Sequence, residues 1–174
     1  MLRRLTLIAV ATMVSLALAG PLSAAPKVVS VGMDHYRGTW LEIGRTPMSI
    51  TDGCVAGYST YTPGRTPGTV DVEDGCYVGT PNGKQKTIRG KGRIEDFGTT
   101  NAKMRVQYLL VIRFNYWVLY KSPDKSWFIS ADPQMKNLWI YSRTVPSKAK
   151  LARMVRKAAD LGYDVRKLEF PEAK

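Results

Sequence analysis

The sequence has few of the residues on which catalysis and metal binding usually depend. Among 174 residues it contains one histidine, His35, and two cysteines, Cys54 and Cys76. It has no Ser-His-Asp arrangement, no metal-ligand spacing and no phosphate-binding glycine loop. We therefore expect no catalytic residue, no metal and no cofactor, and we interpret His35 as a surface or packing residue.

No hydrophobic run is long enough to cross a membrane. Residues 5–19 are apolar and follow Arg3 and Arg4, but this run is shorter than the roughly 20 residues that span a bilayer. The pattern is typical of a secretory signal peptide, which we place at residues 1–25 with the cleavage site left open. Pro21 stands where a lipid-anchor cysteine would follow Leu18-Ala19-Gly20. We expect a periplasmic or secreted protein, soluble after cleavage and without a lipid anchor.

Acidic residues are also scarce, with 14 Asp and Glu against 26 Lys and Arg and a net charge of +12. Such an excess suits anionic lipid surfaces, acidic ligands or nucleic acid. No helix-turn-helix, zinc-finger or RNP-like pattern is present, which argues against nucleic acid. Residues 26–174 contain no linker or repeat and suit a single domain.

Short apolar segments separated by Pro, Gly, Asn and Asp predict an all-β protein. Strands are expected at residues 38–45, 53–61, 69–78, 85–95, 102–110, 113–121, 125–131 and 137–143. Eight antiparallel up-and-down strands can close into a barrel without free edges. An amphipathic helix at 147–161, with a Ser147 N-cap and Gly162 at its end, is expected on the outer wall.

Alternation within the strands separates an apolar inner face from a basic outer face. In the segment 102–110, for example, Met104, Val106 and Tyr108 alternate with Lys103, Arg105 and Gln107. Glu42 has the parity of an inward residue, and we expect it to pair with a basic group inside the barrel.

The two cysteines fall on neighbouring strands. A hairpin centred near Arg65 pairs Tyr58 with Val72 and places Cys54 directly opposite Cys76. An exported protein folds where disulfides persist, so we predict a bridge that contributes roughly 3 kcal/mol. Free buried thiols and a redox thiol are the alternatives.

Several motifs together resemble the lipocalin family, specifically a bacterial outer-membrane type related to apolipoprotein D. The resemblance covers residues 36–170 and is carried by Tyr36-Arg37-Gly38-Thr39-Trp40, by Asn115-Tyr116-Trp117 and by Leu138-Trp139-Ile140-Tyr141-Ser142-Arg143. It implies that Trp40 closes the barrel floor and that Arg143 lies across its indole ring. The up-and-down strand order independently brings these two residues to one end. The missing anchor cysteine, together with Leu41 and Gly44, departs from the family pattern.

The resemblance implies a noncovalent carrier of a fatty acid or lysophospholipid inside the barrel, with no enzymatic activity. The residues expected to bind the ligand are Tyr58, Val72, Ile94, Met104, Val106, Tyr108, Arg113, Tyr116, Trp139 and Tyr141. Tyr116 is preferred over Trp117 for its strand. An acidic head group is assigned to the mouth, first to Arg113 and then to Arg45 or Lys84.

An apolar rim around the open mouth suggests an alternative function. Met48, Ile50, Phe114 and residues 109–112 are expected around the open mouth, where they would suit peripheral membrane contact or a second subunit. The protein is then an interaction module, as a monomer or homodimer. An enzyme acting on a lipid-like substrate is the weaker alternative.

Overall fold

A computed structural model describes residues 25–174 of the chain. The signal peptide predicted for residues 1–25 lies outside this part apart from its last residue. None of the helices within the described residues combines the length and the apolar character needed to cross a membrane.

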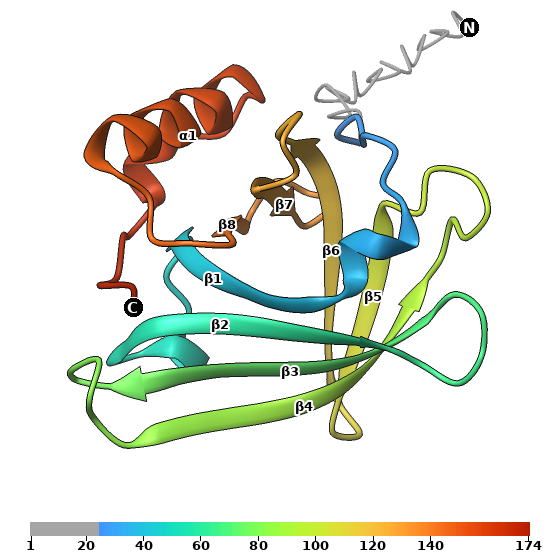
Figure 1. The fold of residues 1–174 in the computed structure, drawn as a ribbon, viewed down its shortest axis with the longest axis horizontal. Coiled ribbons are helices and arrows are strands. Elements are labelled where there is room, and N and C mark those ends of the chain that lie inside the picture. The colour runs from blue at the N-terminus through green and yellow to red at the C-terminus, as the bar shows by residue number, and fades with distance from the viewer. Residues whose placement is uncertain (1–24) are drawn as a thin grey trace, which may run out of the picture.

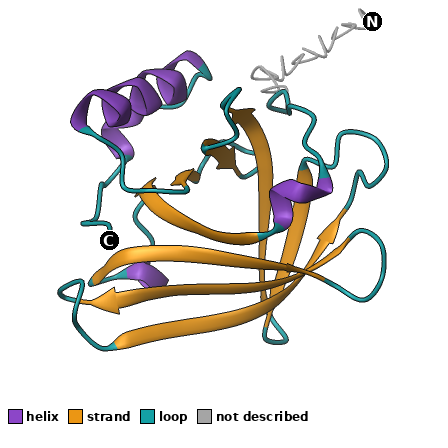
Figure 2. Ribbon diagram, viewed as in Figure 1, coloured by secondary structure: helices purple, strands orange, loops and turns teal. Residues whose placement is uncertain are grey.

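Eight antiparallel strands form a closed barrel in chain order, with the last strand paired to the first. Figures 1 and 2 show β2, β3 and β4 side by side, with β5 and β6 crossing behind them. The strands are β1 (Gly38–Arg45), β2 (Cys54–Pro63), β3 (Thr69–Val78), β4 (Gln85–Ile94), β5 (Lys103–Tyr108), β6 (Ile112–Lys121), β7 (Trp127–Ala131) and β8 (Leu138–Ser142). The predicted eight-stranded barrel is confirmed.

The inner face follows the alternation read from the sequence. Met104, Val106 and Tyr108 on β5 are each no more than 2% exposed. Their neighbours Lys103, Arg105 and Gln107 lie on the outer wall, where Arg105 pairs with Glu95. A side-chain period of two therefore sets both faces of this strand.

Helix α1 (Lys148–Asp160) covers part of the outer wall, as predicted. Its N-cap Ser147 accepts a hydrogen bond from the Lys150 amide. Met154 and Ala158 on the helix are fully buried in a second apolar cluster. This cluster includes Leu138 and Ile140, the two outward-facing apolar residues of β8. The helix is needed because these side chains would otherwise be exposed to water.

One end of the barrel is closed by packed aromatic side chains, among them Trp40 and Phe128. The Arg143 guanidinium carbon lies 3.3 Å from the Trp40 ring centroid. Arg143 also donates hydrogen bonds to the carbonyls of Thr39 and Arg37, at 2.7 and 2.8 Å. His35, in a short 3-10 helix (Met33–Tyr36), packs against Trp40 and is buried. The predicted meeting of Trp40 and Arg143 is confirmed.

A β-bulge in β2 changes the predicted pairing with β3. Val55 pairs with Tyr77, but Tyr58 then pairs with Gly75, so the expected pairing of Tyr58 with Val72 is wrong. The bulge includes Ala56, whose φ is 47°, and the additional residue reverses the parity of the rest of the strand. Ser59 and Tyr61 therefore face inward, and both are buried.

The predicted Cys54–Cys76 disulfide is present, although its predicted register is wrong. Cys54 lies opposite Val78, two residues beyond Cys76. The two Cα atoms are 5.5 Å apart, within the range that a disulfide can bridge. The bridge thus joins a diagonal pair of side chains near the end of the β2-β3 hairpin.

Candidate functional site

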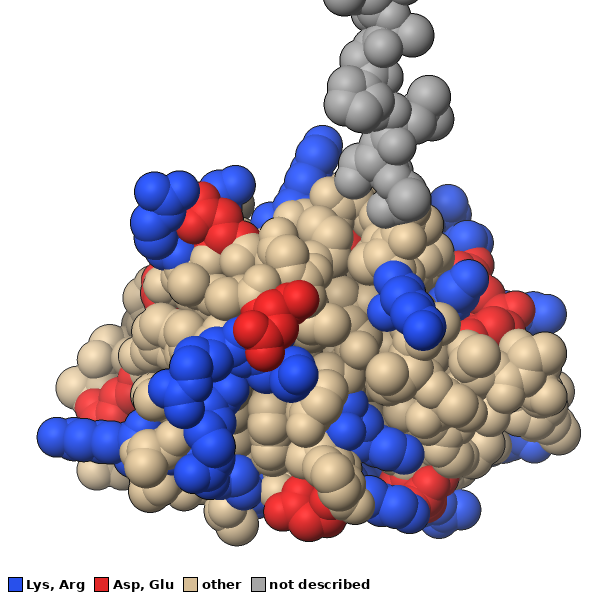
Figure 3. Space-filling view, turned by 90° about the horizontal axis from the view of Figure 1, so that it is seen from above, with Lys and Arg blue, Asp and Glu red and all other residues tan. Residues whose placement is uncertain are grey.

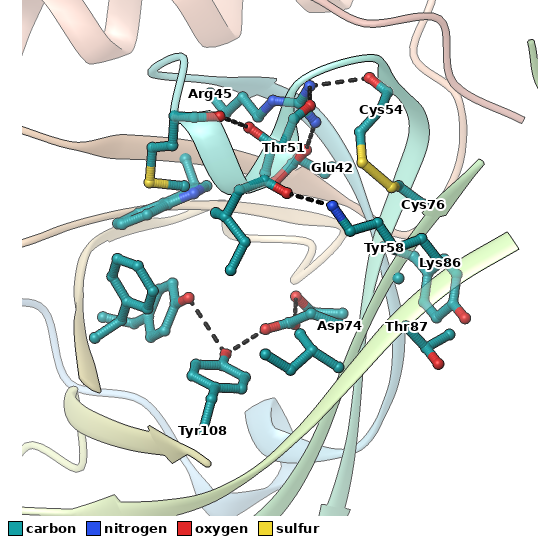
Figure 4. Close-up of a pocket in the computed structure, with 18 of the residues that line it drawn as sticks. Glu42, Arg45, Thr51, Cys54, Tyr58, Asp74, Cys76, Lys86, Thr87 and Tyr108 are labelled. Carbon is teal, nitrogen blue, oxygen red and sulfur yellow. Dashed lines mark hydrogen bonds and ion pairs between the residues drawn. A yellow bond between two sulfur atoms is a disulfide. The ribbon is translucent and has the colours of Figure 1, made fainter. Parts of the chain in front are cut away.

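The open half of the barrel contains a cavity of about 380 Å³. This volume lies within the range of about 300–1,000 Å³ typical of small-molecule sites. The connection from β1 to β2 contributes Met48, Ile50 and Thr51 to its lining, and the β5-β6 turn contributes Leu109. Figure 4 shows polar groups on two sides of the cavity, with Arg45 and Glu42 on one side and Asp74 and Tyr108 on the other.

Four of the predicted ligand residues line this cavity with inward-facing side chains: Tyr108, Tyr116, Trp139 and Tyr141. The Tyr116 and Trp139 ring centroids are 4.7 Å apart, which creates a continuous aromatic wall. Phe114 extends this wall toward the mouth. Trp117 instead packs in the outer cluster below α1, as the preference for Tyr116 predicted.

Tyr58 borders the cavity, but its hydroxyl group belongs to the outer wall. The Gln85 side-chain amide donates to this hydroxyl at 2.7 Å. The hydroxyl also contacts Glu73 Oε1 at 3.4 Å, and Glu73 pairs with the exposed Arg89. The prediction that Tyr58 faces inward is wrong because the bulge reverses the parity of β2.

Four other predicted ligand residues are packed core rather than cavity lining. They are no more than 3% exposed and belong to the main inner cluster: Val72, Ile94, Met104 and Val106. Their half of the barrel is filled by the rings of Tyr36, Trp40, Tyr61 and Phe128. Sequence alternation distinguishes inside from outside, but it cannot distinguish a filled half of a barrel from a hollow one.

Arg113 does not reach the cavity, so its predicted role at the mouth is wrong. It is exposed on the outer wall, where it donates to the Gln107 side chain. Lys84 is exposed in the β3-β4 loop and is not part of the cavity lining. The basic residue at the mouth is instead Lys86. It lines the cavity, and its Nζ donates to the Ile50 carbonyl at 3.0 Å.

A buried ion pair occupies one side of the cavity. Arg45 Nη1 lies 2.5 Å from Glu42 Oε1, which confirms the expected basic partner for Glu42. A bulge between Glu42 and Gly44 turns Arg45 inward. Arg45 is further held by Glu169 at 2.6 Å and by the Cys54 carbonyl at 2.9 Å. Because its donors are already bound, Arg45 is a structural cation rather than a free group for an acidic ligand.

Asp74 presents a carboxylate from β3 on the other side. Ser59 donates to its Oδ1 at 2.5 Å, and the Tyr108 hydroxyl donates to its Oδ2. Tyr108 also lies 3.3 Å from the Tyr116 hydroxyl. Burial raises the pKa of Asp74, and the hydrogen bonds from Ser59 and Tyr108 lower it in part.

Asp74, Ser59 and Lys86 were not predicted as site residues, although one signal was available. Asp74 lies two residues after Val72 on β3, so the alternation that predicted an inward Val72 also applies to Asp74. Lys86 and Ser59 lacked such a signal. The bulge determines the orientation of Ser59, and the loop carrying Ile50 determines that of Lys86.

The site can bind a molecule noncovalently, with an aromatic wall for an apolar body and two separate polar positions. Among residues 25–174, no three His, Cys, Asp or Glu side chains are grouped so that they could hold a metal ion. His35 lies in the closed end beside Trp40 and Phe128, and is not part of the cavity lining.

Comparisons with known proteins agree with this architecture. The Lipocalin-like domain family matches residues 31–173. Temperature-induced lipocalin-1 of Arabidopsis thaliana is 30% identical over 150 residues, covering 81% of this chain and 78% of the relative. A putative lipocalin of Acanthamoeba polyphaga mimivirus is 27% identical over 151 residues, covering 80% and 83%.

Solved structures show the same fold at lower sequence identity. Insecticyanin from the tobacco hornworm Manduca sexta superposes with a TM-score of 0.65 and 18% identity, covering 87% of this chain and 85% of that one. A lobster apocrustacyanin superposes with a TM-score of 0.60 and 14% identity, covering 88% and 93%.

Proposed function

Because this chain belongs to the lipocalin family, we propose that it is a noncovalent carrier of a small amphiphile, such as a fatty acid or lysophospholipid. The observation that carries this proposal is the cavity of about 380 Å³ in the open half of the barrel. Its wall combines Phe114, Tyr116 and Trp139, which provide apolar surface, with few polar groups.

The balance between burial of an acyl chain and the cost of association predicts a moderate affinity. Each buried methylene contributes about 0.8 kcal/mol, while association and ordering of the ligand oppose binding by roughly 4–15 kcal/mol. A chain of about 14–16 methylenes therefore supports micromolar binding. Because the closed half of the barrel is filled, we expect affinity to rise with chain length and then level off.

The same proposal includes an exported protein of the bacterial outer-membrane type, related to apolipoprotein D. The charged and apolar pattern of residues 1–25 supports export, and the disulfide supports an oxidising compartment such as the periplasm. In this proposal the protein binds its ligand without chemical turnover.

The test is titration of the purified mature protein with a fluorescent fatty acid, alongside native mass spectrometry of the protein from its natural compartment. We expect one acyl ligand per chain and saturable micromolar binding. A protein that carries no apolar molecule and gives no saturable signal would contradict the carrier function.

Two matched variants locate the binding site. Ile88 lines the cavity, and Arg89 is the next residue on the outer wall. Ile88→Trp fills the cavity and should weaken binding at least tenfold, whereas Arg89→Trp should bind as the wild type does. Equal binding by both variants would place the ligand elsewhere on the molecule.

A second candidate function rests on the exposed turn between β5 and β6. Leu109, Leu110 and Val111 are 69%, 92% and 86% exposed beside the cavity mouth. The exposed Arg113 follows on β6, and the chain has a net charge of +12. We propose that this turn docks on an anionic membrane, where apolar insertion and charge attraction act together.

Sedimentation with phosphatidylglycerol-containing vesicles tests the docking. Leu110→Ser should reduce vesicle binding several-fold, and salt should weaken binding of the wild type. Val145→Ser serves as the control, because Val145 is also an exposed apolar residue, 54% exposed, but follows β8 at the closed end. Equal loss in both variants would contradict a specific role for the turn.

A further inference from the structure

Asp74 is the one carboxylate among the cavity-lining residues that lacks a cationic partner. The other, Glu42, is paired with Arg45. The two hydrogen bonds to Asp74 come from the neutral hydroxyl groups of Ser59 and Tyr108. An ionised carboxylate has about four acceptor positions, so Asp74 keeps acceptor capacity beyond these two bonds.

The position of Asp74 makes this capacity available to a ligand. It is only partly buried and lines the cavity opposite the Arg45 side (Figure 4). Apart from Ser59 and Tyr108, no side chain among residues 25–174 donates a hydrogen bond to Asp74. A polar group of the ligand that approaches Asp74 must therefore donate a hydrogen bond.

Resting on the carrier function, we propose that Asp74 selects amphiphiles whose buried polar group is a hydrogen-bond donor, either a hydroxyl or a protonated amine. A ligand carboxylate placed beside Asp74 would be repelled, because both groups carry negative charge and both can only accept hydrogen bonds. The free carboxylate of a fatty acid is therefore excluded from this position. It must remain at the mouth, where Lys86 lies.

Ser59 and Tyr108 each occupy one acceptor position of this carboxylate. They hold its two oxygens from β2 and β5, on either side of β3 in the barrel wall. Tyr108 is itself near the Tyr116 hydroxyl, so the cluster extends to β6. Burial raises the pKa of Asp74, whereas the hydrogen bonds from Ser59 and Tyr108 favour its ionised form.

The experiment compares three ligands of one chain length at pH 8: dodecylamine, 1-dodecanol and dodecanoate. Each displaces the neutral probe N-phenyl-1-naphthylamine from the wild type, from Asp74→Asn and from Asp71→Asn. Asp71 is the matched control because it lies on the same strand but pairs with Lys91 on the outer wall.

In the wild type, dodecylamine should displace the probe at a concentration at least tenfold lower than dodecanoate, with 1-dodecanol between them. Asp74→Asn should reduce the amine-to-carboxylate ratio to within about threefold, because a charged hydrogen bond is replaced by a neutral one. Asp71→Asn should keep the ratio of the wild type. The comparison between variants cancels the different solubilities of the three ligands.

Two results would overturn the selection by Asp74 while leaving the carrier function intact: equal displacement by all three ligands in the wild type, or an unchanged ratio in Asp74→Asn. Failure of the probe itself to bind the wild type would overturn both proposals. If Asp74→Asn does not fold, Tyr108→Phe replaces it. This variant retains the carboxylate and frees one of its acceptor positions, so loss of the amine preference there would contradict the proposal.

Discussion

At the scale of single residues, polar groups inside this barrel differ in what binds them. Arg45 and Glu42 form an ion pair, whereas Asp74 accepts hydrogen bonds only from neutral hydroxyl groups. His35 represents a third case, because neither of its ring nitrogens has a hydrogen-bond partner within residues 25–174. Buried polar groups without hydrogen-bond partners usually destabilise a fold, so the unpaired nitrogens of His35 are expected to lower the stability of the closed end.

His35 provides a prediction on pH dependence. Burial lowers the pKa of His35 to about 3, whereas in the unfolded chain it is about 6.5. Between these values the unfolded state binds a proton that the folded state does not, so stability is lost as pH falls from about 6.5 toward 3. At pH 4.5 this amounts to about 3 kcal/mol.

Urea unfolding of the wild type and His35→Phe at pH 7 and pH 4.5 measures this effect. The substitution keeps a ring beside Trp40 and Phe128, so the variant should lose about 2.5 kcal/mol less than the wild type on acidification from pH 7 to pH 4.5. The contributions of all other titrating groups cancel in the difference. Identical losses in the two proteins would contradict a buried neutral His35.

At the scale of elements, two β-bulges determine which side chains reach the cavity. The bulge in β1 turns Arg45 inward, and the bulge in β2 directs Ser59 inward in place of Tyr58. Strands β4 and β5 pair without a register shift, and their inward residues agree with simple alternation. Predictions from the sequence therefore succeed on regular strands and fail after a bulge, because one extra residue reverses the parity.

The disulfide joins β2 and β3 at the end of the cavity next to the bulge. Its loop spans 22 residues, so replacing both Cys54 and Cys76 with serine should lower the free energy of unfolding by about 3 kcal/mol. Chemical denaturation measures this loss. Wild-type protein treated with dithiothreitol should match the double variant, while a variant as stable as the oxidised wild type would contradict a stabilising bridge.

At the scale of the whole molecule, the barrel divides into a filled half and a hollow half. Trp40 and Arg143 close the filled half, α1 covers the wall, and the cavity occupies the other half. Lys and Arg side chains are distributed over the face seen in Figure 3, with fewer Asp and Glu among them. The net charge of +12 favours the approach of the protein to an anionic surface.

Ligand binding should stabilise the whole domain, because the ligand binds the folded barrel and not the unfolded chain. At a ligand concentration 100 times the Kd, the free energy of unfolding should rise by about 2.7 kcal/mol. Thermal unfolding with and without dodecylamine measures the shift. Ile88→Trp should show almost none, and a similar shift in that variant would indicate binding outside the cavity.

The sequence by itself determined the barrel, the inner and outer faces of its regular strands, the covering helix and the meeting of Trp40 with Arg143. These features depend on local periodicity, turn residues and strand order, which can be read from the sequence without knowing which residues are in contact. Only the tertiary structure decided that Val72, Ile94, Met104 and Val106 are solid core and that Asp74 faces a cavity. The physical reason is that register shifts and packed aromatic rings determine where space remains, and both depend on contacts between distant strands.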